Sequence, residues 1–173
     1  TGDEKYRVRA GRIIDHVLTW AEDNDWRIPE HFHKDWTPDL ECNREHPEDP
    51  FKPYGATPGH GIEWARLILQ WTLSTYQDST SVQAAPYLSA AKALYRRAIA
   101  DAWNVDGAPG LVYTTDWNGK PVVHDRMHWT LAEAINTSSI LWHITGEGCY
   151  ATDYASFMKY LDEVVWDHKT GSW

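Results

Sequence analysis

The chain has 173 residues and a formal net charge of −9 at pH 7, which argues against nucleic acid or an anionic membrane as a partner. Its two cysteines, Cys42 and Cys149, offer neither a disulfide framework nor metal-ligand spacing, so a reducing cytoplasm is the expected location. No apolar run reaches the length of a membrane span. Eleven Trp and nine Tyr are unusual, because aromatic side chains this dense line many carbohydrate sites, although most of them are expected in the core.

The first half of the chain predicts two helices around a long irregular connection. Apolar side chains recur at helical spacing in residues 3–24, which favours an amphipathic helix. Residues 25–57 are rich in Pro, Asp, Glu and Asn and show no helical period. Residues 58–76 are apolar on most sides, which predicts a buried helix with Thr57 as its N-cap and Pro58 at its first position.

The second half alternates helices with a hairpin. A short polar stretch leads to a predicted helix over residues 84–104, and residues 110–125 are typical of a β-hairpin with Asn118-Gly119 in a type I′ turn. A fourth helix is expected over residues 128–145, ended by Gly146, and a fifth over residues 152–166. Thr152 is the predicted N-cap of the fifth helix.

The order of connections predicts the architecture. Long connections alternate with short ones, and short connections make neighbouring helices antiparallel, so every long connection emerges at the same end of the array. Loops this long are usually functional, which places the site at that end. The layout favours an all-α fold: an α/α toroid, or barrel of helical hairpins, with a small β-hairpin in a long loop.

Five helices are too few to close such a ring. Residues 1–173 are therefore expected to form an incomplete portion, the C-terminal half, of a single α/α barrel domain. An open half-ring exposes apolar helix faces, so self-association through these faces is expected.

Two residue pairs could carry chemistry at the loop-rich end. His60 and Glu63 share one helix face near the N-terminus, where the helix dipole disfavours imidazolium and Glu63 can orient the ring as a neutral base. The alternative is a capping set in which Glu63 pairs with Arg66. Trp129 and Glu133 offer a stacking face and hydroxyl acceptors for a sugar, or else pack in the core and satisfy a buried loop.

His31 and His33 have the spacing of a pair of metal ligands. On a strand the two rings would face one side, but Glu30 and Asp35 are not specifically spaced as further ligands. Loop packing, or contact between His31 and a substrate, is favoured, and no metal is expected. Neither a phosphate loop nor a dinucleotide fingerprint occurs in the chain.

Three motifs carry a resemblance to a known family. They are "PEHF", "F-x-PYG-x-TPGH-x-x-EWARL" and "HW-x-x-AEA", and the similarity extends over most of the chain. The chain resembles the N-acylglucosamine 2-epimerase superfamily, in the branch of bacterial aldose–ketose isomerases that act on mannose. The resemblance implies an α/α barrel of about six hairpins and proton transfer on a monosaccharide without cofactor or metal.

The resemblance also implies roles for individual residues. His60 corresponds to a catalytic acid/base, Glu63 belongs to the same site, and Trp129 and Glu133 contact the substrate. The family uses two further histidines, one in an upstream helix that would precede Thr1 and one expected just beyond Trp173. His33 stands where an acidic residue is expected.

The function expected from this resemblance is cofactor-independent interconversion of an aldose and a ketose, of the mannose/fructose type, through a cis-enediol. The fragment alone is expected to be inactive. The alternatives are a sugar 2-epimerase of the N-acylglucosamine or cellobiose type, a glycoside hydrolase or lyase on a similar barrel, and a non-catalytic sugar-binding fragment. A hydrolase would need a carboxylate pair, for which Glu63 and Glu133 could be proposed, but their neighbours fit isomerases better.

Overall fold

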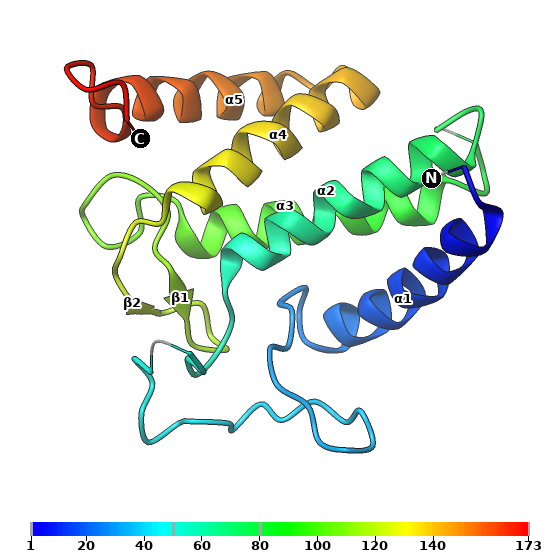
Figure 1. Cartoon of the computed structure of the whole chain (residues 1–173), viewed down its shortest axis with the longest axis horizontal. Helices are drawn as coiled ribbons and strands as arrows, with labels where there is room; N and C mark the ends of the chain where they lie inside the picture. The colour runs from blue at the N-terminus through cyan, green and yellow to red at the C-terminus, as the bar shows by residue number, and fades with distance from the viewer. Residues whose placement is uncertain (1, 50, 80, 173) are drawn as a thin grey trace.

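The computed structural model describes residues 2–49, 51–79 and 81–172, and this part of the chain is mostly helical (Figure 1). The helices predicted at 3–24, 58–76, 84–104 and 128–145 are confirmed to within two residues at either end. The observed helices are α1 (Glu4–Asp23), α2 (Pro58–Thr75), α3 (Ala85–Ala102), α4 (His128–Thr145) and α5 (Gly148–Tyr160), which continues into a π-helical turn, η1 (Leu161–Val165).

Helix α2 lies at the centre of the packing. It makes its most extensive contacts with α3 and α4, while α5 packs on α4 and α1 lies along α2. Successive helices are antiparallel, so α2 and α4 begin at the end where α1, α3 and α5 finish (Figure 1). The two long connections, residues 24–57 and 103–127, both lie at that end, as predicted from their order in the sequence. These are the helical hairpins of an α/α barrel.

The core fills the space between these helices. The largest fully buried apolar side chains include Ile62 and Leu69 of α2 and Leu94 of α3. Two helices approach closely at Gly61, where an added Cβ would lie 3.4 Å from Ala98 Cβ. The polar tip of a buried ring is also satisfied, since the Tyr95 hydroxyl donates to Asp153 at 2.9 Å and ties α3 to α5.

The hairpin is present, but its turn differs from the prediction. Strands β1 (Thr114–Thr115) and β2 (Pro121–Val123) pair antiparallel. The Gly119 N–H donates to the Asp116 carbonyl at 3.0 Å, and of the Asn118-Gly119 pair only Gly119 has positive φ, at +81°. This is a type I turn with Gly119 in the left-handed bulge position, in place of a type I′ turn. The Asp116 carboxylate accepts from the Asn118 N–H at 2.9 Å and stabilises the right-handed turn.

One predicted helix cap, Thr152, is wrong, and a second, Thr57, is confirmed in position but lacks a side-chain hydrogen bond. Helix α5 begins at Gly148, four residues before the predicted cap Thr152, because Gly146 ends α4 in the left-handed conformation and Glu147 can serve as the N-cap position. Thr57 does stand at the N-cap position of α2, but its hydroxyl makes no capping hydrogen bond.

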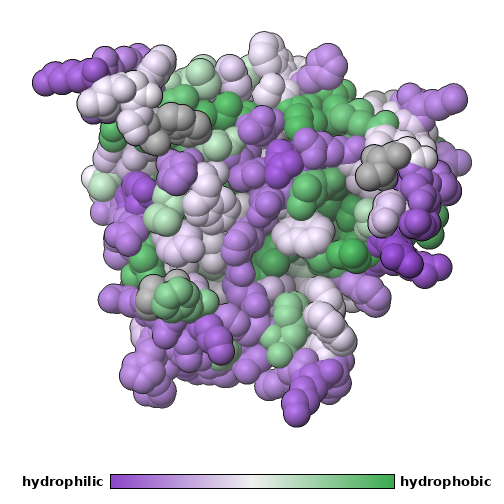
Figure 2. All heavy atoms as spheres, in the orientation of Figure 1, coloured by the Kyte–Doolittle hydropathy of each residue, from purple (hydrophilic) through white to green (hydrophobic). Residues whose placement is uncertain are grey.

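Several large apolar side chains lie on the surface. Figure 2 shows hydrophobic patches over the helices, separated by hydrophilic side chains. Exposed examples are Ile13 of α1, Trp142 of α4 and Val164 of η1, at 55%, 48% and 56% exposure. These helices therefore expose apolar side chains, as expected. Self-association through their exposed faces stays a prediction. None of the described helices is long and apolar enough to cross a membrane.

Candidate active site

The loop-rich end brings His60 and Glu30 together. His60 lies on the first turn of α2, and its Nδ1 is 2.9 Å from Glu30 Oε2 and 3.0 Å from Oε1. The Glu30 side chain is only 15% exposed, and Oε1 also accepts the Thr57 N–H at 3.2 Å. An ionised carboxylate can only accept, so the ring donates through Nδ1–H and leaves the Nε2 lone pair available for a proton. This His–Glu dyad is the chemical centre of the candidate site.

The hairpin fixes where α2 begins. Ala56 and Thr115 exchange two backbone hydrogen bonds, each of 2.9 Å, so the segment leading into α2 pairs with β1. Gly55 makes this approach feasible, because its φ is +90° and an added Cβ would lie 2.0 Å from the Thr115 carbonyl oxygen. The backbone carrying His60 is thereby held against a second element.

The electrostatics of His60 differ from the sequence expectation. Burial lowers the pKa of the ring, but the hydrogen bond and charge of Glu30, with the charge of Glu63, outweigh it, so the pKa is raised above its ordinary value. The helix dipole alone would have favoured a neutral ring. The orienting carboxylate is also different: Glu30 from the long connection contacts the ring, where the sequence pointed to Glu63.

An aromatic face completes the surroundings of His60. The Trp129 ring lies 5.3 Å from the His60 ring between centroids, with a tilt of 31°. The approach depends on Gly59, where an added Cβ would come within 2.6 Å of both Trp129 Cη2 and Thr130 Cγ2. The edge of Tyr113 supports Trp129 at 6.4 Å between centroids. A half-buried indole beside an imidazole is suited to hold an apolar sugar face near a base.

Almost two turns further along α2, two carboxylates flank the guanidinium of Arg66. Arg66 donates from Nη2 to Glu133 Oε1 at 2.9 Å and from Nε to Oε2, forming a fork between α2 and α4. The Glu133 hydrogen bond raises the pKa of Arg66. Glu63 is 3.9 Å from the same guanidinium, so the ion pair considered as the alternative for Glu63 is present. The Glu133 carboxylate therefore pairs with an arginine of α2, where the alternative expected it to satisfy a buried loop.

His31 lies next to Glu30 in the long connection. Its Nε2 is 3.2 Å from the Pro53 carbonyl oxygen, which orders the loop that leads to α2. Contact between His31 and a substrate stays a prediction. Within residues 2–49, 51–79 and 81–172, no group of three or more His, Cys, Asp or Glu side chains is arranged to hold a metal ion.

Comparison with known proteins identifies the family. The profile described as N-acylglucosamine 2-epimerase (GlcNAc 2-epimerase) matches residues 1–173. The chain belongs to the N-acylglucosamine 2-epimerase family. Its relatives include proteins named D-mannose isomerase from Pseudomonas cannabina pv. alisalensis, 40% identical, and from Thermobifida fusca, 38% identical, each matched over the whole of this chain.

Two solved structures share the fold of this chain. A crystal structure of D-mannose isomerase matches all of this chain with a TM-score of 0.90 and 27% identity. The cellobiose 2-epimerase from Spirochaeta thermophila DSM 6192 matches with a TM-score of 0.73 and 18% identity, a likeness of fold alone. The chain spans 42% of the length of the two curated isomerases and 43% of the first structure, so it corresponds to part of an α/α barrel.

Proposed function

We propose that this chain contributes an acid/base dyad to a sugar isomerase that interconverts an aldose and a ketose, of the mannose/fructose type. The observation that carries the proposal is the hydrogen bond between His60 Nδ1 and Glu30, which leaves Nε2 available as a base. The names of the two relatives at 40% and 38% identity supply the substrate class. No cofactor or metal enters the proposed reaction.

The proposed reaction transfers one proton between neighbouring carbons. The open-chain aldose binds with C2 near His60 Nε2, which removes the C2 proton, and the C–H electron pair forms the cis-enediolate. Glu30 stabilises the imidazolium that results, as the carboxylate of a catalytic triad does. Delivery of a proton to C1, with transfer of the hydroxyl proton from O2 to O1, gives the ketose.

Other residues would hold the substrate. Trp129 offers a ring face beside His60, and Glu133 and Glu63 offer acceptors for sugar hydroxyls on the next turn. His31 is placed beside Glu30 and is proposed as a further contact. Arg66 orients the Glu133 carboxylate, so Glu133 can accept from a hydroxyl through its remaining lone pairs.

Epimerisation at C2 is the second candidate, and the epimerase name of the matching family favours it. The same enediolate would then be protonated at C2 from its opposite face. This outcome needs a second acid/base group across the substrate from His60.

Proton NMR in D2O tests these proposals. D-mannose and D-fructose are incubated separately with the complete gene product, with its His60→Asn variant, and with the 173-residue chain. Mannose–fructose interconversion with deuterium at C1 or C2, lost in His60→Asn, supports the isomerase. An aldose epimer with deuterium at C2 and no ketose moves the assignment to a 2-epimerase. Undiminished turnover in His60→Asn removes this residue from the mechanism.

A further inference from the structure

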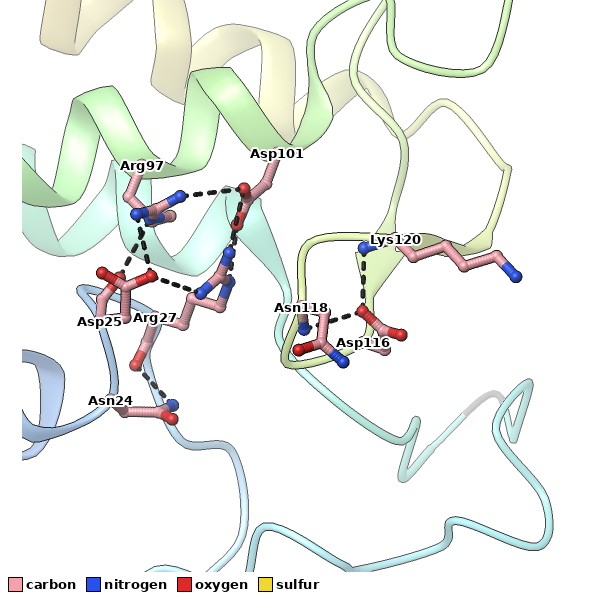
Figure 3. Close-up of polar contacts among 8 residues, drawn as sticks. All are labelled: Asn24, Asp25, Arg27, Arg97, Asp101, Asp116, Asn118 and Lys120. Atoms are coloured by element: carbon pink, nitrogen blue, oxygen red, sulfur yellow. Dashed lines mark hydrogen bonds and ion pairs between the residues drawn. The ribbon is translucent and has the colours of Figure 1, made fainter.

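A group of four charges, two of them buried, lies beside the candidate site but is not part of it. This ion-pair cluster consists of Asp25, Arg27, Arg97 and Asp101 (Figure 3). Arg27 donates two hydrogen bonds to the Asp101 carboxylate, from Nε to Oδ2 at 2.7 Å and from Nη2 to Oδ1 at 3.2 Å. The two side chains are only 7% and 9% exposed. Asp25 bridges the two arginines, at 3.0 Å from Arg27 and 2.9 Å from Arg97.

We propose that Arg27 and Asp101 are positioning residues whose ion pair fixes Glu30 against His60. The inference rests on the proposed function, because it deepens the role of the dyad. Arg27 stands three residues before Glu30, and the residues between them, Ile28 and Pro29, are buried. Three extended residues span about 10 Å at most, and the proline ring restricts the backbone further. A fixed Arg27 therefore leaves Glu30 little freedom.

The other end of the ion pair is anchored to the helix that supports His60. Asp101 lies in the last turn of α3, which packs closely on the start of α2. An added Cβ at Gly61, the residue after His60, would lie 3.4 Å from Ala98 Cβ and 3.9 Å from the Leu94 carbonyl oxygen of α3. Helix α3 therefore positions both members of the dyad. It positions His60 by packing against α2, and it positions Glu30 through the ion pair between Asp101 and Arg27.

The turn that directs the chain toward Glu30 depends on the same cluster. Asp25 and Trp26 are consecutive non-glycine residues with φ of +53° and +63°, a conformation that persists only when its surroundings hold it. Arg97 stabilises this conformation, since its Nε donates to the Asp25 carbonyl at 3.0 Å and its guanidinium also pairs with the Asp25 carboxylate. Asn24 closes the turn by donating to the Arg27 carbonyl at 3.0 Å. The strained turn and the ion pair therefore form one unit.

The hairpin turn covers the ion pair. An added Cβ at Gly119 would lie 2.7 Å from Asp101 Oδ1 and 3.1 Å from Arg27 Nη2, so the turn backbone lies against both charges. Asp116 shapes this turn by accepting from the backbone amides of Asn118 and Lys120, each at 2.9 Å (Figure 3). Buried ion pairs often contribute no more stability than apolar pairs of the same size, so a geometric role explains this arrangement better than stability does.

The test measures the His60 titration by NMR of its ring protons in the complete gene product. The variants are Asp101→Asn and the double variant Arg27→Met/Asp101→Leu, in which an apolar pair replaces the ion pair and is expected to preserve folding. Glu163→Gln, in the exposed Lys159–Glu163 pair, is the control. The charges that act on the ring are Glu30 of the loop and Glu63 of α2, and Arg66 of α2 with His128 and Glu133 of α4 are further charged or titratable groups on the neighbouring helices.

In both cluster variants we expect a lower His60 pKa, because Glu30 no longer stays on Nδ1, and a kcat/KM reduced roughly 10- to 100-fold. Glu163→Gln should change neither. A folded double variant with the wild-type titration and the wild-type kcat/KM would overturn the inference. The titration needs no substrate: if the wild-type protein turns over no sugar yet the titration shifts, the positioning role stands and the proposed function fails.

Discussion

Replacing Glu30 by Gln tests the electrostatic role of the dyad while keeping its shape. The amide oxygen of Gln can still accept from His60 Nδ1 and from the Thr57 N–H, but the negative charge is lost. Hydrogen bonds to charged groups contribute about 1.5–3 kcal/mol. The His60 side chain is 38% exposed, so solvent screening favours the lower bound, about 1.5 kcal/mol, which is roughly a tenfold change in rate.

The direction of the effect follows from the raised His60 pKa. A protonated ring cannot act as a base, so wild-type kcat/KM should fall as the pH decreases through that pKa. Glu30→Gln should lower the pKa of His60, so the decrease of kcat/KM on the acid side of the pH profile should move to lower pH. The constant value of kcat/KM reached at higher pH should be roughly tenfold lower. Glu163→Gln is the matched control. The reasoning would be refuted if Glu30→Gln showed the same kcat/KM at higher pH as the wild-type protein and the same pH for its decrease on the acid side.

Three further variants test the site and its support. Gly55→Ala, with φ of +90° and Cβ only 2.0 Å from the Thr115 carbonyl oxygen, should destabilise the protein by about 3 kcal/mol in urea unfolding; a change below about 1 kcal/mol contradicts the geometry. Glu133→Gln weakens the fork with Arg66 and should raise the KM for the sugar roughly tenfold with a smaller effect on kcat; an unchanged KM removes Glu133 from substrate binding. The raised pKa of His60 implies stability that is present below its unfolded pKa and is lost as pH rises through the folded value, so His60→Asn should cost more unfolding free energy at about pH 5 than at about pH 9. Equal losses at both pH values would contradict that sign.

Helix periodicity and connection lengths predicted most of the fold. Apolar residues recur at helical spacing in residues 3–24 and 84–104, which predicts helices with one buried face. The observed bounds of α1 and α3 agree closely with this prediction. Local turn chemistry was less predictable. Asn118-Gly119 fits a type I′ turn in isolation, but the Asp116 side chain holds Asn118 right-handed and moves Gly119 to the bulge. A hydrogen bond from a backbone amide to the Asp116 side chain forms only when the fold brings the two groups together, so the local sequence alone does not predict it.

The sequence predicted His60 as the candidate base and Glu63 as its orienting carboxylate, but the carboxylate that contacts the ring is Glu30. Spacing rules connect residues three or four apart on one helix, which favoured Glu63. Glu30 lies 30 residues earlier, in a connection with no period, so no helical spacing rule links it to His60. The "PEHF" motif of the resemblance contained Glu30, and that was the available signal.

The most direct test of the central claim is exchange of the C2 proton of D-mannose with D2O, followed by NMR in the complete gene product and in its His60→Asn variant. If His60 Nε2 removes this proton, the wild-type protein incorporates deuterium at C2 or C1 and His60→Asn incorporates none above the uncatalysed background. Deuterium incorporation by the variant at the wild-type rate would contradict the account.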